Sequence, residues 1–156
     1  GGTEVVFSCG GGIFTSAVDA AVKAGGKVIG VDVDQAGVIA AYAAGEDGDP
    51  AEYADLTVTS AMKGLAATVK TLLSDVVSAS FEGGKIDTLG LVSEVPEENF
   101  VQIAGSTQFG EGFTADDYAE LVAALFAGEI TVSNDTEAAA ADMATVVAVN
   151  DLGNLK

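Results

Sequence analysis

Two short stretches near the N-terminus decide the fold. The first is Val5-Val6-Phe7-Ser8-Cys9, which leads into Gly10-Gly11-Gly12, and the second is Lys27-Val28-Ile29-Gly30-Val31-Asp32-Val33. The second stretch is almost continuously apolar, as expected of a strand buried on both faces of a parallel sheet. Between them, residues 14–24 place alanines on one helical face and end at Gly25-Gly26. The order strand, helix, strand predicts a βαβ unit.

The same alternation continues along the chain. We expect a short helix over 36–44, an acidic surface turn over 45–50, a third strand over 56–59, a long amphipathic helix over 61–81 and a fourth strand over 88–92. Further on we expect a loop over 96–113 with a short strand at 100–103, a helix from the capping box at Thr114 to Gly128, strands at 129–133 and 145–149, and helix or linker at 137–144. This pattern predicts an α/β fold with an open, mainly parallel sheet and helices on both faces, in one domain over residues 1–156.

The charge of the chain excludes one large class of partners. There are 24 acidic residues against six basic ones in 156 residues, which gives a formal net charge of −18, and all six basic residues are lysines. So acidic a surface repels nucleic acids and anionic lipids, and it lacks the bidentate guanidinium groups that grip phosphate. Hydrophobic residues make up 49% of the chain, enough for a packed core. We therefore expect a folded domain with no nucleic-acid partner.

The counts of histidine and cysteine limit the catalytic and metal-binding sites that the chain can form. The chain has no histidine, which excludes a Ser-His-Asp triad or a histidine zinc site within it, and its one cysteine, Cys9, is interpreted as a small buried residue at a strand end. The acidic residues of 47–55 lack the spacing of a calcium loop and are interpreted as a solvated surface. We predict no enzyme activity, no metal site and no resident cofactor. The chain opens without an initiator Met, signal peptide or lipobox, so it is either cytosolic or a piece of a longer protein.

A candidate binding site lies at the carboxyl edge of the predicted sheet. The glycine turn after the first strand and Asp32 at the end of the second both lie there, where ligands of open α/β sheets bind. Lys63, placed in the first turn of the helix after the third strand, either faces a ligand, pairs with Asp32 or Asp34, or is simply solvated. The glycine turn is explained equally well as a tight turn that binds no ligand.

A dinucleotide-binding interpretation is the alternative. Asp32 follows Gly12 by 20 residues, the spacing at which an acidic residue binds the ribose of NAD in a Rossmann domain. In Gly10-Gly11-Gly12-Ile13-Phe14-Thr15, however, a threonine stands where the fingerprint has its third glycine. A Rossmann-type NAD-binding domain of an oxidoreductase thus stays open as a second hypothesis.

The chain resembles a known family over nearly its whole length. The segments Ser8-Cys9-Gly10-Gly11-Gly12-Ile13-Phe14-Thr15-Ser16 and Gly30-Val31-Asp32-Val33-Asp34-Gln35 are similar to the basic-membrane-protein (PnrA-like) family of substrate-binding lipoproteins. Thr59-Ser60-Ala61-Met62-Lys63 and the segment 126–132 are similar to it as well. The resemblance covers only the second lobe of that family's two-lobed, type I periplasmic-binding fold.

The resemblance implies a function without catalysis. Members of the family are extracytoplasmic receptors of ABC importers, and the well-studied ones bind purine nucleosides in a cleft between two lobes. By similarity, Asp32 binds ribose hydroxyls, Lys63 contacts the ligand, Gly11 and Gly12 line the cleft, and Phe14 adds an apolar wall. The implied partners are a nucleoside-like solute and the transporter's permease, and the implied location is periplasmic or on the cell membrane, through an N-terminal lipid anchor outside this chain.

Two departures from the family bear on the ligand. The family's common Gly-Gly-Thr-Gly turn is replaced here by Gly11-Gly12-Ile13-Phe14, and the stretch 34–60 is longer than usual. A sugar or another small polar solute therefore stays open beside a nucleoside. The acidic composition favours a neutral, hydroxyl-bearing solute over an anion. The isolated lobe presents half a site, so we expect its own affinity to be weak or immeasurable.

Overall fold

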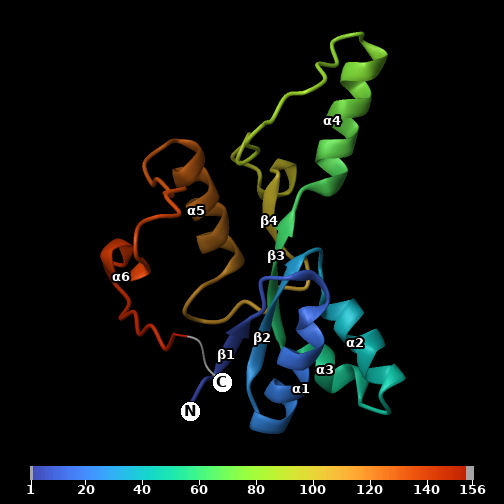
Figure 1. Cartoon of the computed structure of the whole chain (residues 1–156), viewed down its shortest axis with the longest axis vertical. Coiled ribbons are helices and arrows are strands. Elements are labelled where there is room, and N and C mark those ends of the chain that lie inside the picture. The colour runs from blue at the N-terminus through green and yellow to red at the C-terminus, as the bar shows by residue number, and fades with distance from the viewer. Residues whose placement is uncertain (1, 154–156) are drawn as a thin grey trace.

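The computed structural model of the chain describes residues 2–153 and shows an α/β fold around a four-stranded open sheet (Figure 1). Strands β1 (Val5–Phe7), β2 (Lys27–Asp32) and β3 (Thr57–Lys63) are parallel neighbours in that order. Strand β4 (Val101–Ile103) completes the sheet and pairs antiparallel with β3. The predicted open, mainly parallel sheet flanked by helices is confirmed. Of the domain expected over 1–156, residue 1 and residues 154–156 lie outside the described part.

Three helices pack against one face of the sheet. They are α1 (Phe14–Ala24), preceded by the 3-10 turn η1 (Gly11–Ile13), α2 (Ala36–Gly45) and α3 (Pro50–Asp55). Right-handed crossovers between strands that step in one direction place successive helices on the same side. The main hydrophobic cluster lies under them and consists of Val18, Ala21, Val28, Ile39 and Leu56. The predicted helices over 14–24 and 36–44 are thus confirmed nearly to the residue.

The sheet and α2 meet most closely at Gly30. A Cβ added there would lie 2.5 Å from Ser60 Oγ and 2.8 Å from Gln35 Oε1. Ser60 and Gln35 are both buried: the Gln35 side chain accepts a hydrogen bond from the Val31 N–H, and Ser60 Oγ accepts one from the Gln35 backbone N–H. Only a residue without a side chain fits between them, so the glycine sets how closely β2, β3 and α2 approach.

The opposite face of the sheet is covered in part. Helix α5 (Ala115–Phe126) lies there, and its Tyr118 hydroxyl accepts a hydrogen bond from the Ile103 backbone (Figure 1). The predicted capping box is confirmed, because the Thr114 and Asp117 side chains accept hydrogen bonds from each other's backbone N–H groups. The Asp117 carboxylate accepts hydrogen bonds from the Thr114 hydroxyl and, with a smaller effect, from the Thr114 N–H, and these lower the pKa of Asp117. The helix covers the β4 end of the face and leaves β1 exposed.

Helix α4 (Leu65–Val77) stands apart from the sheet. It continues β3 after the single residue Gly64 and extends away from the body of the molecule (Figure 1). The sequence analysis was wrong about its bounds: β3 runs on to Lys63, pairing with β2 up to Met62 and with β4 over residues 61–63, so the helix begins at Leu65 rather than Ala61. It ends at Val77 rather than Phe81. None of its side chains is buried.

Three predicted strands are absent from the described residues. Residues 88–92 are not a strand, and at their end the side chain of the buried Asn99 accepts hydrogen bonds from the backbone N–H groups of Val92 and Ser93. Residues 129–133 and 145–149 have no neighbouring strand to pair with and form irregular structure. Apolar runs alone do not make strands where no partner edge is supplied.

Three smaller corrections concern short elements. The expected acidic turn over 45–50 leads directly into a helix, α3, which the sequence analysis missed although Asp49 caps it and Pro50 begins it. The region 137–144 holds one helical turn, α6 (Ala140–Met143), and the 96–113 loop also contains the 3-10 turn η2 (Pro96–Glu98). Cys9 is exposed rather than buried and lies two residues beyond Phe7, where β1 ends.

The contact at Gly30 gives a first prediction. We expect Gly30→Ala to lower the free energy of unfolding by about 1–3 kcal/mol, because the added methyl group must displace Ser60 and Gln35. Gly37→Ala in α2 is the matched control: the same methyl group there meets nothing within 4 Å and should leave stability unchanged or raise it by about 0.5–1 kcal/mol. Urea unfolding measures both. Equal effects of the two changes would contradict the packing described.

Candidate functional site

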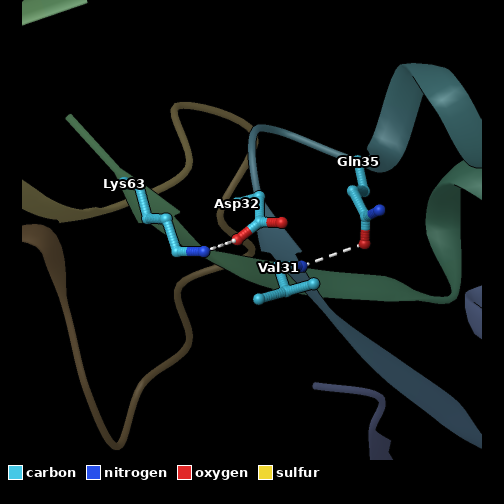
Figure 2. Close-up of polar contacts among 4 residues, drawn as sticks. All are labelled: Val31, Asp32, Gln35 and Lys63. Atoms are coloured by element: carbon cyan, nitrogen blue, oxygen red, sulfur yellow. Dashed lines mark hydrogen bonds and ion pairs between the residues drawn. The ribbon is translucent and has the colours of Figure 1, made fainter. Parts of the chain in front are cut away.

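Asp32 stands at the carboxyl end of β2 in an unusual backbone conformation. Its φ angle is +71°, in the left-handed region of backbone conformation that residues other than glycine seldom adopt. Such a conformation costs about 1–3 kcal/mol and persists only where its surroundings enforce it. The side chain is thereby turned toward the end of β3 rather than along its own strand (Figure 2).

The surroundings that enforce it lie on both sides of Asp32. The buried Gln35 side chain accepts a hydrogen bond from the Val31 backbone at 2.9 Å (Figure 2). The Gln35 backbone donates to Ser60 Oγ at 3.0 Å. Asp34 accepts hydrogen bonds from the backbone N–H of Ala36 and from Ser106. The turn between β2 and α2 is therefore fastened at both ends, and Asp32 is held between them.

Lys63 forms an ion pair with Asp32. The Lys63 Nζ lies 2.7 Å from Asp32 Oδ1, which is itself shielded from solvent (Figure 2). The Asp32 side chain as a whole is nevertheless 38% exposed and that of Lys63 is 68% exposed. The exposed part of the carboxylate is therefore the side of Oδ2, which points away from the lysine (Figure 2). The sequence analysis named Asp32 and Asp34 as possible ion-pair partners of Lys63, and in the structure Lys63 pairs with Asp32.

The ion pair changes the titration of the lysine. The hydrogen bond to Asp32 and the attraction of its charge raise the pKa of Lys63 above its ordinary value, and Cys9 at the end of β1 adds a smaller effect. Desolvation acts in the opposite direction but is outweighed. The parallel pairing of β1, β2 and β3 brings their carboxyl ends to the same edge of the sheet.

A hollow of about 610 Å³ opens beside the ion pair, between the end of β3 and the first turns of α4. Its polar lining comes from Lys63, Lys70, Glu97, Glu98 and Gln102. Gln102 donates both amide protons to the backbone, to Glu97 O and Asn99 O, each at 2.7 Å. The arrangement offers ammonium donors and carboxylate and amide acceptors to a small polar molecule.

The remaining predicted site residues lie elsewhere. Gly11 and Gly12 form η1 at the start of α1; both are exposed, with nothing within 4 Å of where a Cβ would stand. Neither lines the hollow beside Lys63. Phe14 packs edge-on against the Tyr42 ring, 6.0 Å away, at the margin of the hydrophobic cluster. The structure thus brings Asp32 and Lys63 together and places the other three around the first helix.

Sequence reasoning missed the residues that β4 contributes. Gln102 reaches the site because β4 pairs antiparallel with β3, which puts Gln102 opposite Met62. Gly64 permits this pairing to end in close contact, since a Cβ there would lie 2.7 Å from the Phe100 Cα. The short apolar run at 100–103 signalled a strand, but nothing in it indicated which edge it would join.

Similarity to known proteins, metal-binding groups and membrane-spanning helices were each sought in the chain. No known family model matches the chain, and no curated protein matches it either. Within residues 2–153, no group of three or more Cys, Asp or Glu side chains is placed to hold a metal ion. In the same part of the chain, no helix is both long and apolar enough to cross a membrane.

The ion pair gives a second prediction. A group whose pKa is raised in the folded state contributes stability below its ordinary pKa and loses that contribution as pH rises through the folded-state value. We therefore expect the ion pair of Lys63 to break only above the ordinary lysine range, and Asp32→Asn to return the pKa of Lys63 toward that range. NMR titration of the lysine side-chain resonances measures this. A Lys63 pKa indifferent to Asp32→Asn would contradict the pairing.

Proposed function

We propose that the chain binds a neutral, ribose-bearing solute such as a purine nucleoside at the carboxyl edge of its sheet, without chemical conversion. The observation that carries the proposal is Asp32, held in a left-handed conformation with Oδ1 bound to Lys63 and the other side of its carboxylate open. A carboxylate oxygen accepts two hydrogen bonds, which suits the adjacent hydroxyls of a ribose. Lys63 keeps donors for the same ligand.

The charges around the hollow support a neutral solute over an anion. Lys63 and Lys70 are set against Asp32, Glu97 and Glu98, so positive charge does not dominate. Lys63 is in addition already neutralised by Asp32. A phosphate group would gain little there and would be repelled by the acidic surface of the whole chain. A molecule that presents hydroxyls and amides loses nothing in this environment.

The resemblance described above extends the proposal to a biological setting. A solute receptor of an ABC importer closes two lobes around its ligand, and the site here lies on an open edge of the sheet, where one surface of a cleft would be formed. In this proposal the chain is one lobe of such a receptor, and its partners are the solute and the permease. The receptor acts outside the cytoplasm, held by a lipid anchor that belongs to another part of the protein.

One observation favours the second hypothesis, an NAD-binding domain. The parallel pair β1–β2, the glycine turn of η1 and Asp32 at the end of β2 follow the order of a dinucleotide-binding unit. The pairing of Asp32 with Lys63 weighs against it, because the carboxylate then faces β3 rather than the glycine turn. The two hypotheses place the ligand differently, and this separates them experimentally.

The experiment is an NMR titration of the chain with guanosine, inosine, adenosine and NAD at millimolar concentration, where weak binding by a half-site is visible. With a nucleoside we expect shifts of the amides of 32–33 and 62–64, and Asp32→Asn should weaken that binding at least about tenfold, as for loss of a charged hydrogen-bond partner. The control is Asp87→Asn, which breaks the exposed Lys85–Asp87 pair away from the site and should change nothing.

The outcomes distinguish the hypotheses. Shifts with NAD centred on residues 10–12 would support the dinucleotide-binding domain and overturn the solute-binding proposal. No shift with any nucleoside, or equal weakening by Asp32→Asn and Asp87→Asn, would likewise overturn it.

A further inference from the structure

Gln102 presents only a hydrogen-bond acceptor to the hollow beside the ion pair. Its side-chain nitrogen Nε2 has two protons, and both are donated to backbone carbonyl oxygens, those of Glu97 and Asn99, each at 2.7 Å. The amide group cannot be turned over, because its oxygen would then face two carbonyl oxygens that have no proton to donate. The side-chain oxygen Oε1 is therefore the group that remains for a ligand.

The Oε1 atom of Gln102 is open to such a ligand. In the described residues, the hydrogen bonds of this side chain are the two donated by Nε2, and Oε1 is not among the buried polar atoms that lack a partner. Gln102 lines the hollow together with Met62 and Glu97. An acceptor without a protein partner thus lies in the wall of the candidate site.

The two carbonyl groups that hold Gln102 are themselves held in place. Asn99 is 0% exposed, and its side chain uses its whole hydrogen-bonding capacity: Oδ1 accepts from the N–H groups of Val92 and Ser93, and Nδ2 donates to Ser93 O and Val95 O. A buried amide with all its partners fixes the loop around it. The orientation of Gln102 is therefore set before any ligand binds.

Gln102 lies in line with Asp32 across three strands. Asp32 is opposite Met62 in the pairing of β2 with β3, and Met62 is opposite Gln102 in the pairing of β3 with β4. Neighbouring strands lie about 4.8 Å apart, so the backbone of Gln102 is about 10 Å from that of Asp32. Between them, Met62 offers a thioether, a favourable neighbour for an aromatic ring. A nucleoside that follows this row, with its ribose at Asp32, brings the edge of its base to Gln102.

The other polar side chains on this side of the hollow are acceptors as well. Glu97 and Glu98 of η2 line it with carboxylates. The ammonium groups that line it belong to Lys63 and Lys70, which come from the end of β3 and from α4. The side formed by β4 and η2 therefore suits a ligand group that donates a hydrogen bond, because a group that only accepts would leave these oxygens without a partner.

From this arrangement we propose that Gln102 selects nucleosides whose base carries an N–H donor, by accepting a hydrogen bond from that group at Oε1. The inference rests on the proposed function, because it takes the ribose to be held by Asp32. The amino or ring N–H groups of adenosine, guanosine and inosine meet this requirement. A base with acceptor nitrogens alone displaces water from Oε1 without replacing its hydrogen bond, and it binds more weakly.

The first test compares ligands on the unaltered chain by NMR titration. Adenosine and inosine each carry a base N–H group, whereas purine riboside has the same ribose and ring system without one. We expect purine riboside to bind about fivefold more weakly than either, the effect of one lost hydrogen bond. With glutamine labelled by ¹³C, the Cδ resonance of Gln102 should move on binding of adenosine or inosine and move less with purine riboside.

The second test removes the acceptor. Gln102→Met keeps a side chain of similar length without the amide group. Gln108→Met is the matched control, because Gln108 also donates both Nε2 protons to backbone carbonyls, those of Asp55 and Thr57, and does not line the hollow. Both variants thus lose an equivalent pair of hydrogen bonds. We expect Gln102→Met to abolish the preference for adenosine over purine riboside and Gln108→Met to retain it, after circular dichroism has established that both are folded.

Failure of this inference is distinguishable from failure of the proposed function. Equal affinity for adenosine and purine riboside, both weakened by Asp32→Asn, would overturn the role of Gln102 and leave nucleoside binding in place. A preference for adenosine that survives Gln102→Met, or that Gln108→Met abolishes equally, would also overturn that role. Binding of no nucleoside at all would overturn the proposed function and this inference with it.

Discussion

Three buried groups at the middle of the sheet, the Val31 N–H, the Gln35 side chain and the Ser60 hydroxyl, hold the rest of the structure in register. They fasten the end of β2 to the start of α2 and both to β3. Buried polar groups without partners are costly, so the geometry that satisfies all three is strongly preferred over its alternatives. Gly30 makes this geometry sterically accessible.

The site at the carboxyl edge follows from that arrangement. Asp32 lies between two fastened residues and has no freedom to relax to an ordinary conformation, while Lys63 comes three residues after Ser60 on the neighbouring strand. Their ion pair compensates a carboxylate oxygen that is shielded from water. The left-handed backbone conformation therefore sets the direction of the Asp32 carboxylate, and the ion pair with Lys63 compensates its charge in that position.

The sequence predicted well those elements whose signals are local. The first helix, second strand and capping box at Thr114 were found because each depends on residues within one or two turns of the chain. The proximity of Asp32 and Lys63 was predicted for a related reason, since parallel strands bring their carboxyl ends together whatever their partners are. The fold class and the meeting of these two side chains were thus accessible to sequence reasoning, and their role in binding stays a prediction.

The failures share a different cause. Residues 61–63 of β3 pair with β4, some forty residues further on, and the contribution of Gln102 depends on the same pairing. Residues 88–92 have the composition of a strand, yet at their end the Val92 N–H and the following Ser93 N–H are taken by the Asn99 side chain. In each case a distant partner decided the conformation, and no property of the segment itself revealed that partner.

The turn at residues 104–108 has a consequence for the order in which the chain gains its structure. It is joined to the body by contacts of long sequence separation: Ser106 to Asp34, 72 residues apart, and Gln108 to Asp55, 53 apart. The loop-closure entropy of such contacts exceeds that of the βαβ pairings within residues 5–63. A folding chain therefore meets its larger entropic cost after the first three strands are in place.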